Sequence, residues 1–373
     1  MALLHGVKQL IGRMAVAATT ARADPEAAAS AEVELLTPTR PLQMIRLNAA
    51  FAPLVDSIPP SCLDTPSMMS LPEKQFLFGL ASRHYSGSGI IVDAGIFLGG
   101  STRCFGEGVR SNPQREDITR NWPRPIVSYD KAIVNPNMPR FFRKHGLTLS
   151  ATPGESFESE LRRNIEPVKA LVDLRIGDFM DAAELDCPVE ILFLDILKAP
   201  GLCLRAFRLF YSKLIPGRSV VVHQDYFFEE LPWIKTHQEA LAAYFDFVGE
   251  IGSSAVFLCT KKVPQAVVDD LENGMPPADQ LRLASIAMQR SADPARRFFM
   301  ALSKMRLIRK LQGRVAARAY LELVKTEFPE QVAQTDNARL SYALRRAEEF
   351  LVKKSRKVRK DGMRTTELRV LSP

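Results

Sequence analysis

The chain has 373 residues, of which 46% are hydrophobic and 25% charged, so it is typical of an ordered globular protein with a sizeable core. Its net charge of +8 is uneven, because residues 263–373 carry 22 Lys and Arg against 13 Asp and Glu, and residues 1–262 carry 28 against 29. The five cysteines lack the close spacing of a disulfide framework or a zinc cluster. No apolar run approaches the roughly 18 residues that span a bilayer, and we expect a cytoplasmic protein.

Within the first 69 residues, only residues 1–23 show a pattern of apolar spacing that indicates a regular element. Residues 1–23 lack acids and have loosely helical apolar spacing, which suits a presequence, a membrane-surface helix or an ordinary surface helix. Residues 24–40 have the composition of a linker, and residues 41–71 contain five prolines. We therefore interpret residues 1–69 as an N-terminal helix, a linker and an irregular segment.

Residues 70–262 alternate between strand and helix patterns. A helix over residues 72–84 precedes an apolar run, residues 89–94, that ends at a glycine turn. Short apolar runs bounded by glycine indicate buried parallel strands. Ser101 or Thr102 is expected to cap a helix that begins at Arg103. Such a strand, turn and helix direct backbone N–H groups at a ligand.

Four further strands are expected, each preceded by a helix or a loop. They cover residues 125–130, 171–176, 190–195 and 219–222. Two last strands, residues 247–251 and 255–260, flank a Gly-Ser-Ser turn and predict an antiparallel hairpin. The pattern predicts an α/β fold with a Rossmann-like, doubly wound seven-stranded sheet, and ligands at the carboxyl ends of the strands.

Residues 263–373 form a basic, wholly helical extension in this interpretation. Prolines at 276–277, 294 and 329 divide it into four helices, and residues 353–360 are a dense basic run. The basic helices suit a solvated face, contact with another protein or an anionic membrane surface. Nucleic acid is not expected, because no RNA-binding signature is visible and residues 1–262 are nearly neutral.

Three acids end predicted strands at the edge where a ligand is expected. Asp130, Asp178 and Asp195 close the second, third and fourth strands. A carboxylate after the second strand suits a ribose diol, as in nucleotide-binding α/β folds. Taken singly, each acid could equally cap a helix or start a turn. Together with the glycine turn, they favour a nucleoside pocket.

The motif Asp93-x-Gly95-x-x-x-Gly99-Gly100-Ser101-Thr102, with these acids, the Phe193-Leu194-Asp195 strand end and the closing hairpin, resembles class I S-adenosylmethionine-dependent methyltransferases. Within that class it looks like the small-molecule and sugar (macrocin-type) O-methyltransferases. The resemblance implies that Asp93 orders the loop, that Asp130 binds the ribose and that Asp178 binds the adenine amine. The cofactor residues implied are Asp93, Gly95, Gly99, Gly100, Ser101, Thr102, Asp130, Asp178 and Asp195.

Phe97 stands where the commoner G-x-G-x-G loop has its middle glycine. If its ring filled the cofactor pocket, the turn would be structural only. For the chemistry, His223 is the expected general base, because imidazole titrates near neutral pH. Asp195 and Asp225 would orient it or hold Mg²⁺. The alternative is that His223 makes only local hydrogen bonds.

Tyr226, Phe227, Phe228 and Trp233 follow the last parallel strand and suit either an acceptor platform or core packing. The resulting prediction is an enzyme that methylates a hydroxyl of a sugar, glycan or other small molecule. A non-catalytic, methyltransferase-like binding module is the alternative. An NAD(P)-dependent oxidoreductase is less favoured, because the glycine spacing differs from the dinucleotide fingerprint.

Overall fold

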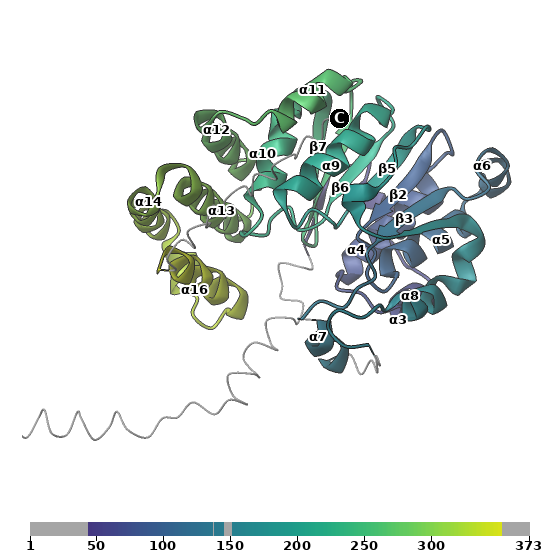
Figure 1. Cartoon of the computed structure of the whole chain (residues 1–373), viewed down its shortest axis with the longest axis horizontal. Helices are drawn as coiled ribbons and strands as arrows, with labels where there is room; N and C mark the ends of the chain where they lie inside the picture. The colour runs from purple at the N-terminus through teal and green to yellow at the C-terminus, as the bar shows by residue number, and fades with distance from the viewer. Residues whose placement is uncertain (1–43, 137, 145–150, 353–373) are drawn as a thin grey trace, which may run out of the picture.

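The computed structural model describes residues 44–136, 138–144 and 151–352, and these build an α/β structure around one mixed eight-stranded sheet (Figure 1). The strand order is β1-β7-β8-β6-β5-β2-β3-β4. The expected N-terminal helix and linker and the basic run at residues 353–360 lie outside the described residues.

Five neighbouring strands are parallel, as the alternation of strand and helix patterns predicts. Their order reverses between β2 and β5, so chain segments leave the sheet in opposite directions there and open a crevice at the carboxyl ends. The three central strands Ile90–Ala94, Val189–Leu194 and Val220–His223 are wholly buried and contain many β-branched residues, which suits a sheet covered on both faces, whereas the edge strand Val172–Ile176 is mostly half-buried. They are β2 (Ile90–Ala94), β3 (Ile126–Asp130), β4 (Val172–Ile176), β5 (Val189–Leu194) and β6 (Val220–His223).

The predicted closing hairpin is confirmed by β7 (Phe245–Ile251) and β8 (Ser254–Cys259), which pair antiparallel. β8 lies between β6 and β7. The prediction of seven strands is wrong, because β1 (Ile45–Leu47) pairs antiparallel with β7 and extends the sheet. This short strand belongs to the segment that the sequence indicated was irregular.

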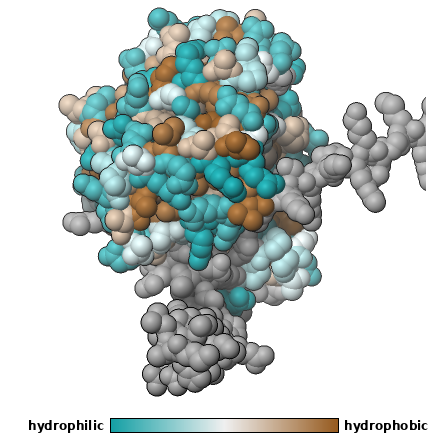
Figure 2. All heavy atoms as spheres, turned by 90° about the vertical axis from the view of Figure 1, so that its left-hand side faces the viewer, coloured by the Kyte–Doolittle hydropathy of each residue, from teal (hydrophilic) through white to brown (hydrophobic). Residues whose placement is uncertain are grey.

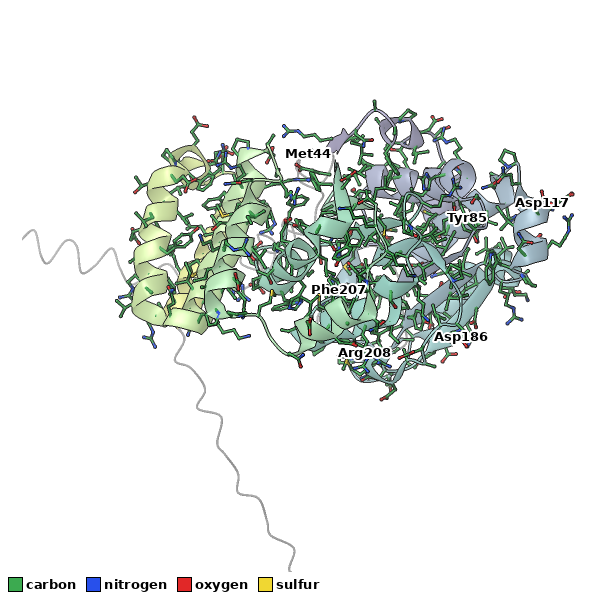
Figure 3. The ribbon with its side chains drawn as sticks, turned by 90° about the horizontal axis from the view of Figure 1, so that it is seen from above. Met44, Tyr85, Asp117, Asp186, Phe207 and Arg208 are labelled. Atoms are coloured by element: carbon green, nitrogen blue, oxygen red, sulfur yellow. The ribbon has the colours of Figure 1, made fainter. Side chains whose placement is uncertain are left out.

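Two clusters of buried side chains cover the opposite faces of the sheet. On one face, α4 (Leu71–Gly79) and α5 (Gly100–Ser111) pack with Ile91 and Phe193. On the other, α9 (Pro200–Phe210), α10 (Pro232–Ala240) and helices of the C-terminal region form one continuous cluster with sheet residues such as Leu192 and Val221. Figure 3 labels Tyr85, which belongs to the first cluster, and Phe207, which belongs to the second.

The C-terminal region contributes six α-helices within the described residues, two more than expected. Prolines begin α12, α13 and α15 as predicted, but Gly313 separates α13 from α14, and residues 334–337 separate α15 from α16. Because these helices share a core with the sheet, no separate core begins at residue 263. They are α11 (Gln265–Glu272), α12 (Pro277–Met288), α13 (Pro294–Gln312), α14 (Arg314–Glu327), α15 (Pro329–Ala333) and α16 (Ala338–Val352).

Arginines of this region are paired with acids of the α/β part. Arg290 lies 2.8 Å from Glu239, and Arg306 lies 2.8 Å from Glu230. These ion pairs therefore neutralise part of the excess positive charge of the C-terminal region within the molecule. Figure 2 views the side of the molecule where the C-terminal helices lie, and hydrophobic and hydrophilic side chains are intermingled on it.

The remaining elements are short. They include α3 (Pro60–Asp64), α6 (Arg115–Asn121), α7 (Met138–Lys144) and α8 (Glu158–Ile165), with 3-10 or π turns at Ala52–Leu54, Leu80–His84, Glu166–Leu171, Phe179–Asp181, Tyr211–Lys213 and Ala242–Tyr244. Over the described part of the chain, every helix is too short or too polar to cross a membrane.

Candidate functional site

A cavity of about 470 Å³ opens at the carboxyl ends of the parallel strands. Gly95, Asp130, Asp195 and Gln224 come from the ends of β2, β3, β5 and β6, and the β7–β8 turn adds Gly252 and Ser253. The C-terminal helices close the opposite side. The other lining residues are Met68, Phe97, Lys131, Asn135, Met138, Ile196, Lys198, Leu202, Asp225, Phe227, Phe228, Arg296, Phe299 and Arg339.

The glycine turn brings two strand ends into close contact. Gly95 has a φ of 92°, and a β-carbon on it would lie 2.7 Å from the carbonyl carbon of Asp195. Phe97 also has a positive φ, 52°, which is uncommon for a bulky residue. Its ring stacks on Phe142 at 5.9 Å and meets Phe157 edge-on. The ring thus forms one wall, and the cavity stays open beside it.

The rest of the predicted cofactor loop supports the turn from outside the cavity. Asp93 is fully buried and accepts a hydrogen bond of 2.7 Å from Thr102 Oγ1, which ties β2 to the first turn of α5. Burial raises the pKa of Asp93 to about 7, although the Thr102 hydroxyl opposes the shift. Ser101 is buried in the same helical turn. Helix α5 begins at Gly100, so the expected cap at Ser101 or Thr102 is wrong.

Gly99 and Gly100 are required by packing. Gly99 is the left-handed N-cap residue of α5, with a φ of 90°, and a β-carbon there would lie 2.5 Å from Ile165. A β-carbon on Gly100 would lie 2.6 Å from the Ser67 side chain. Neither glycine lines the cavity. The resemblance implied that both glycines are cofactor residues, whereas the contacts observed at these two positions are with protein.

Asp130 lines the cavity and holds the glycine turn. Its Oδ2 accepts from the backbone N–H of Phe97 at 2.7 Å, and its Oδ1 accepts from that of Ala132 at 2.7 Å. Burial raises the pKa of Asp130, and the N–H donors oppose this shift. Each carboxylate oxygen has a second lone pair, so the side chain can still accept from a ligand hydroxyl.

Asp178 does not reach the cavity. It is exposed, accepts from Met180 N at 3.0 Å, and pairs with Lys131 at 3.0 Å. The Met180 N–H and the Lys131 ammonium lower the pKa of Asp178. Lys131 itself lines the cavity. Asp178 therefore lies outside the cavity in which the predicted contact with adenine would be made.

Lys198 joins the two acids that were predicted for the chemistry. Its Nζ lies 2.6 Å from Asp195 Oδ1 and 2.5 Å from Asp225 Oδ2. The acids meet because β5 and β6 are parallel neighbours, with Leu194 opposite His223. Asp225 has a φ of 58°, a conformation that Asp tolerates better than most residues.

The surroundings shift the pKa values of Asp195, Asp225 and Lys198 in different directions. Burial, assisted by Asp225, raises the pKa of Asp195 to about 7 despite the Lys198 ammonium. Burial also opposes ionisation of Asp225, but Lys198 outweighs it and the pKa of Asp225 is lowered. The two carboxylates raise the pKa of Lys198 against the effect of burial. Lys198 is therefore a permanent cation near neutral pH.

The same geometry tests the expected metal site. Within residues 44–136, 138–144 and 151–352, no three His, Cys, Asp or Glu side chains are grouped to hold a metal ion. The position between Asp195 and Asp225 is taken by the Lys198 ammonium. A divalent ion needs several oxygen ligands, and these two carboxylates already neutralise a cation. The residues present do not fit Mg²⁺.

His223 is the last residue of β6; its side chain is buried in the layer of α9 and α10 and does not line the cavity. Its Nε2 lies 2.9 Å from Tyr211 Oη and 3.0 Å from Gln238 Oε1. Burial lowers the pKa of His223 to about 4. This placement does not fit the expected general base, because a base must reach the acceptor proton. The contacts of His223 with Tyr211 and Gln238 agree instead with the alternative that His223 makes only local hydrogen bonds.

The outer wall combines aromatic rings with two arginines. Phe227 and Phe228 line the cavity, as the platform interpretation required, whereas Tyr226 is fully buried in the core. Arg296 lies over the Phe227 ring at 4.3 Å and pairs with Glu250. These contacts hold the Arg296 guanidinium between an aromatic ring of the wall and an acid of β7.

The second arginine comes from α16. Arg339 lies over Phe299 at 4.4 Å, and its Nη2 is 2.5 Å from Glu229. Sequence reasoning missed Arg296, Arg339 and Lys198. Arg296 and Arg339 lie far along the chain from the sheet and give no local signal. Lys198, three residues after Asp195, could have been found as a cation within reach of a strand-end acid.

Comparison with models of known protein families gave no match, and comparison with curated protein sequences gave none either.

Proposed function

We propose that this protein is a S-adenosylmethionine-dependent methyltransferase that acts on a hydroxyl group of a small molecule. The observation that carries the proposal is the cavity itself. A glycine turn, a strand-end carboxylate and a carboxylate–ammonium–carboxylate cluster all face one space at the switch point of a parallel sheet. Ligands of open α/β sheets bind at such switch points. A volume of about 470 Å³ also falls in the range of small-molecule sites.

The residues on the β2–β3 side fit the nucleoside part of the cofactor. Gly95 leaves the turn without a side chain where the strand ends converge. Asp130 retains acceptor capacity for a ribose diol after binding Phe97 and Ala132. Phe97 adds an aromatic side chain to the lining of the same space. Asp93 and Thr102 hold the turn in place from behind.

S-adenosylmethionine would supply an electrophilic methyl group. The protein must then orient the acceptor hydroxyl and remove its proton. Asp195 has one oxygen bound to Lys198 and a second oxygen that can accept the proton. With the cofactor bound, the acceptor oxygen would displace the methyl group from sulfur, and Asp195 would take up the hydroxyl proton. The products would be a methyl ether, the thioether form of the cofactor and a protonated carboxyl group.

The aromatic wall favours an acceptor with a flat or apolar body. Phe227, Phe228 and Phe299 face the cavity from the side opposite the glycine turn. Aromatic faces bind both aromatic rings and the apolar faces of sugars. The acceptor would therefore lie between this wall and Asp195.

Methyl transfer from labelled S-adenosylmethionine to a panel of phenols and sugars tests the proposal. Label should enter at least one acceptor with the wild-type protein, and Asp195→Asn should reduce the rate at least about a hundredfold. Asp246→Asn, on the exposed face of β7, is the matched control and should leave the rate unchanged. Cofactor binding without transfer to any acceptor would favour the non-catalytic binding module.

A further inference from the structure

The carboxylate pair of the cavity already contains its own counter-ion. Asp195 and Asp225 project from neighbouring strand ends, at the position where the sequence suggested a magnesium site. Lys198 Nζ is 2.6 Å from one carboxylate and 2.5 Å from the other. Its stem starts from the loop after β5, three residues beyond Asp195, so the cation is covalently part of the site.

The surroundings leave the ammonium accessible from the cavity. The Lys198 side chain is 50% exposed and lines the cavity, whereas the Asp195 side chain is only 20% exposed. An ammonium has three N–H donors. Two of them are used in the bonds to Asp195 and Asp225. The third can donate to a ligand oxygen.

The loop that carries Lys198 is held from both sides. Asp195 N donates to Ala94 O at 2.8 Å, and Trp233 Nε1 donates to Leu197 O at 2.8 Å. Helix α9 begins immediately afterwards at Pro200. The lysine stem thus starts from a fixed backbone, which reduces the entropy lost when its head is held between two carboxylates.

We propose that Lys198 is the resident cation of this cavity and stands between Asp195 and Asp225 in the place of a divalent metal ion. Its third N–H binds the acceptor oxygen, a role that rests on the proposed methyl transfer. The acceptor class that follows is a hydroxyl compound held by one hydrogen bond from an ammonium. A metal-chelating diol would instead need two open positions on an ion.

Manganese binding tests the proposal without any enzymatic turnover. Mn²⁺ is titrated into the full chain, and bound and free ion are separated by electron paramagnetic resonance. Wild type should show no saturable site, whereas Lys198→Met should gain one site at least about tenfold tighter than any binding by wild type. The double variant Lys198→Met/Asp225→Asn should lose that site again. Lys131→Met removes another lysine of the same cavity and should gain no site.

Two results would overturn the proposal. One is a wild-type Mn²⁺ site that Asp225→Asn abolishes, and the other is a folded Lys198→Met protein that gains no site. If Lys198→Met does not fold, as judged by circular dichroism, Lys198→Gln decides the question with a side chain of similar length. Failure to bind S-adenosylmethionine would refute the proposed function. It would not affect the Mn²⁺ titration, which still decides whether Lys198 takes the place of a metal ion.

Discussion

A β-carbon on Gly95 would lie 2.7 Å from the carbonyl carbon of Asp195, so these two residues can approach only because the first is glycine. The contact joins the end of β2 to the end of β5. Those strands carry the glycine turn and the catalytic cluster of the proposed enzyme. Gly95 also has a φ of 92°, which an L side chain rarely adopts.

Gly95→Ala should therefore disturb both halves of the cavity. We expect a loss of stability of about 2–4 kcal/mol and a loss of cofactor binding, since strain and overpacking act together. Urea denaturation and calorimetry measure the two effects. Gly201→Ala is the control, because Gly201 lies in α9 with nothing within 4 Å of its β-carbon position. A stable Gly95→Ala protein with normal binding would contradict the described turn.

The ion pair of Arg296 and Glu250 should dominate the attachment of α13 to the sheet. Both side chains are nearly inaccessible, at 2% and 3%. Arg296→Met leaves a buried carboxylate without its partner, and we expect a loss of about 3–5 kcal/mol in urea denaturation. Arg297→Met removes the adjacent arginine, whose pair with Glu327 is exposed and 3.8 Å long, and should cost less than about 0.5 kcal/mol. Similar losses in both variants would refute this assignment.

His223 should matter for stability and not for catalysis. Its pKa is about 4 in the folded protein and ordinarily 6.5. Between these values the unfolded chain binds a proton on His223 that the folded chain does not, so the contribution of His223 to stability should fall as the pH drops from about 6.5 to about 4. Asp93 and Asp195, whose pKa values are raised to about 7, act in the opposite direction, so the informative quantity is the stability difference between wild type and His223→Gln, which should change over this pH range. The variant should leave the methylation rate within about threefold of wild type. His237, whose pKa is also lowered to about 4, makes a contribution of the same sign that the variant keeps. A hundredfold loss of rate in a folded His223→Gln protein would restore His223 as the base.

Removal of metal ions should leave activity intact. Because Lys198 supplies the positive charge between Asp195 and Asp225, methylation should proceed at the same rate after dialysis against EDTA. The rate is measured with and without added Mg²⁺. A chelator-sensitive rate that Mg²⁺ restores would show that the carboxylates hold a metal during turnover.

The parts of the fold that follow from local pattern were predictable. Apolar runs that end in glycine or an acid gave the parallel strands, and the Gly252–Ser253 turn gave the hairpin. Strand β1 was missed because it has only three residues, which are exposed or half-buried and carry no alternating pattern. The packing of α13 and α16 against the cavity depends on tertiary contacts that no local pattern records.

The position of His223 could have been predicted from strand alternation. In β6 the side chains of Val220 and Val222 belong to one face, whereas Val221 belongs to the other. His223 shares the parity of Val221, so it points into the layer of α9 and α10. Asp225, two residues beyond the strand, is free of that alternation and reaches Lys198.

Calorimetric titration of S-adenosylmethionine tests the central claim most directly. We predict one binding site per chain for wild type, an affinity at least about tenfold weaker for Asp130→Asn, equivalent to about 1.4 kcal/mol, and no binding of NAD. The tenfold loss is expected because the variant replaces an oxygen that accepts from the backbone N–H of Phe97 or Ala132. Absence of S-adenosylmethionine binding by the folded wild-type protein would contradict the assignment of the cavity.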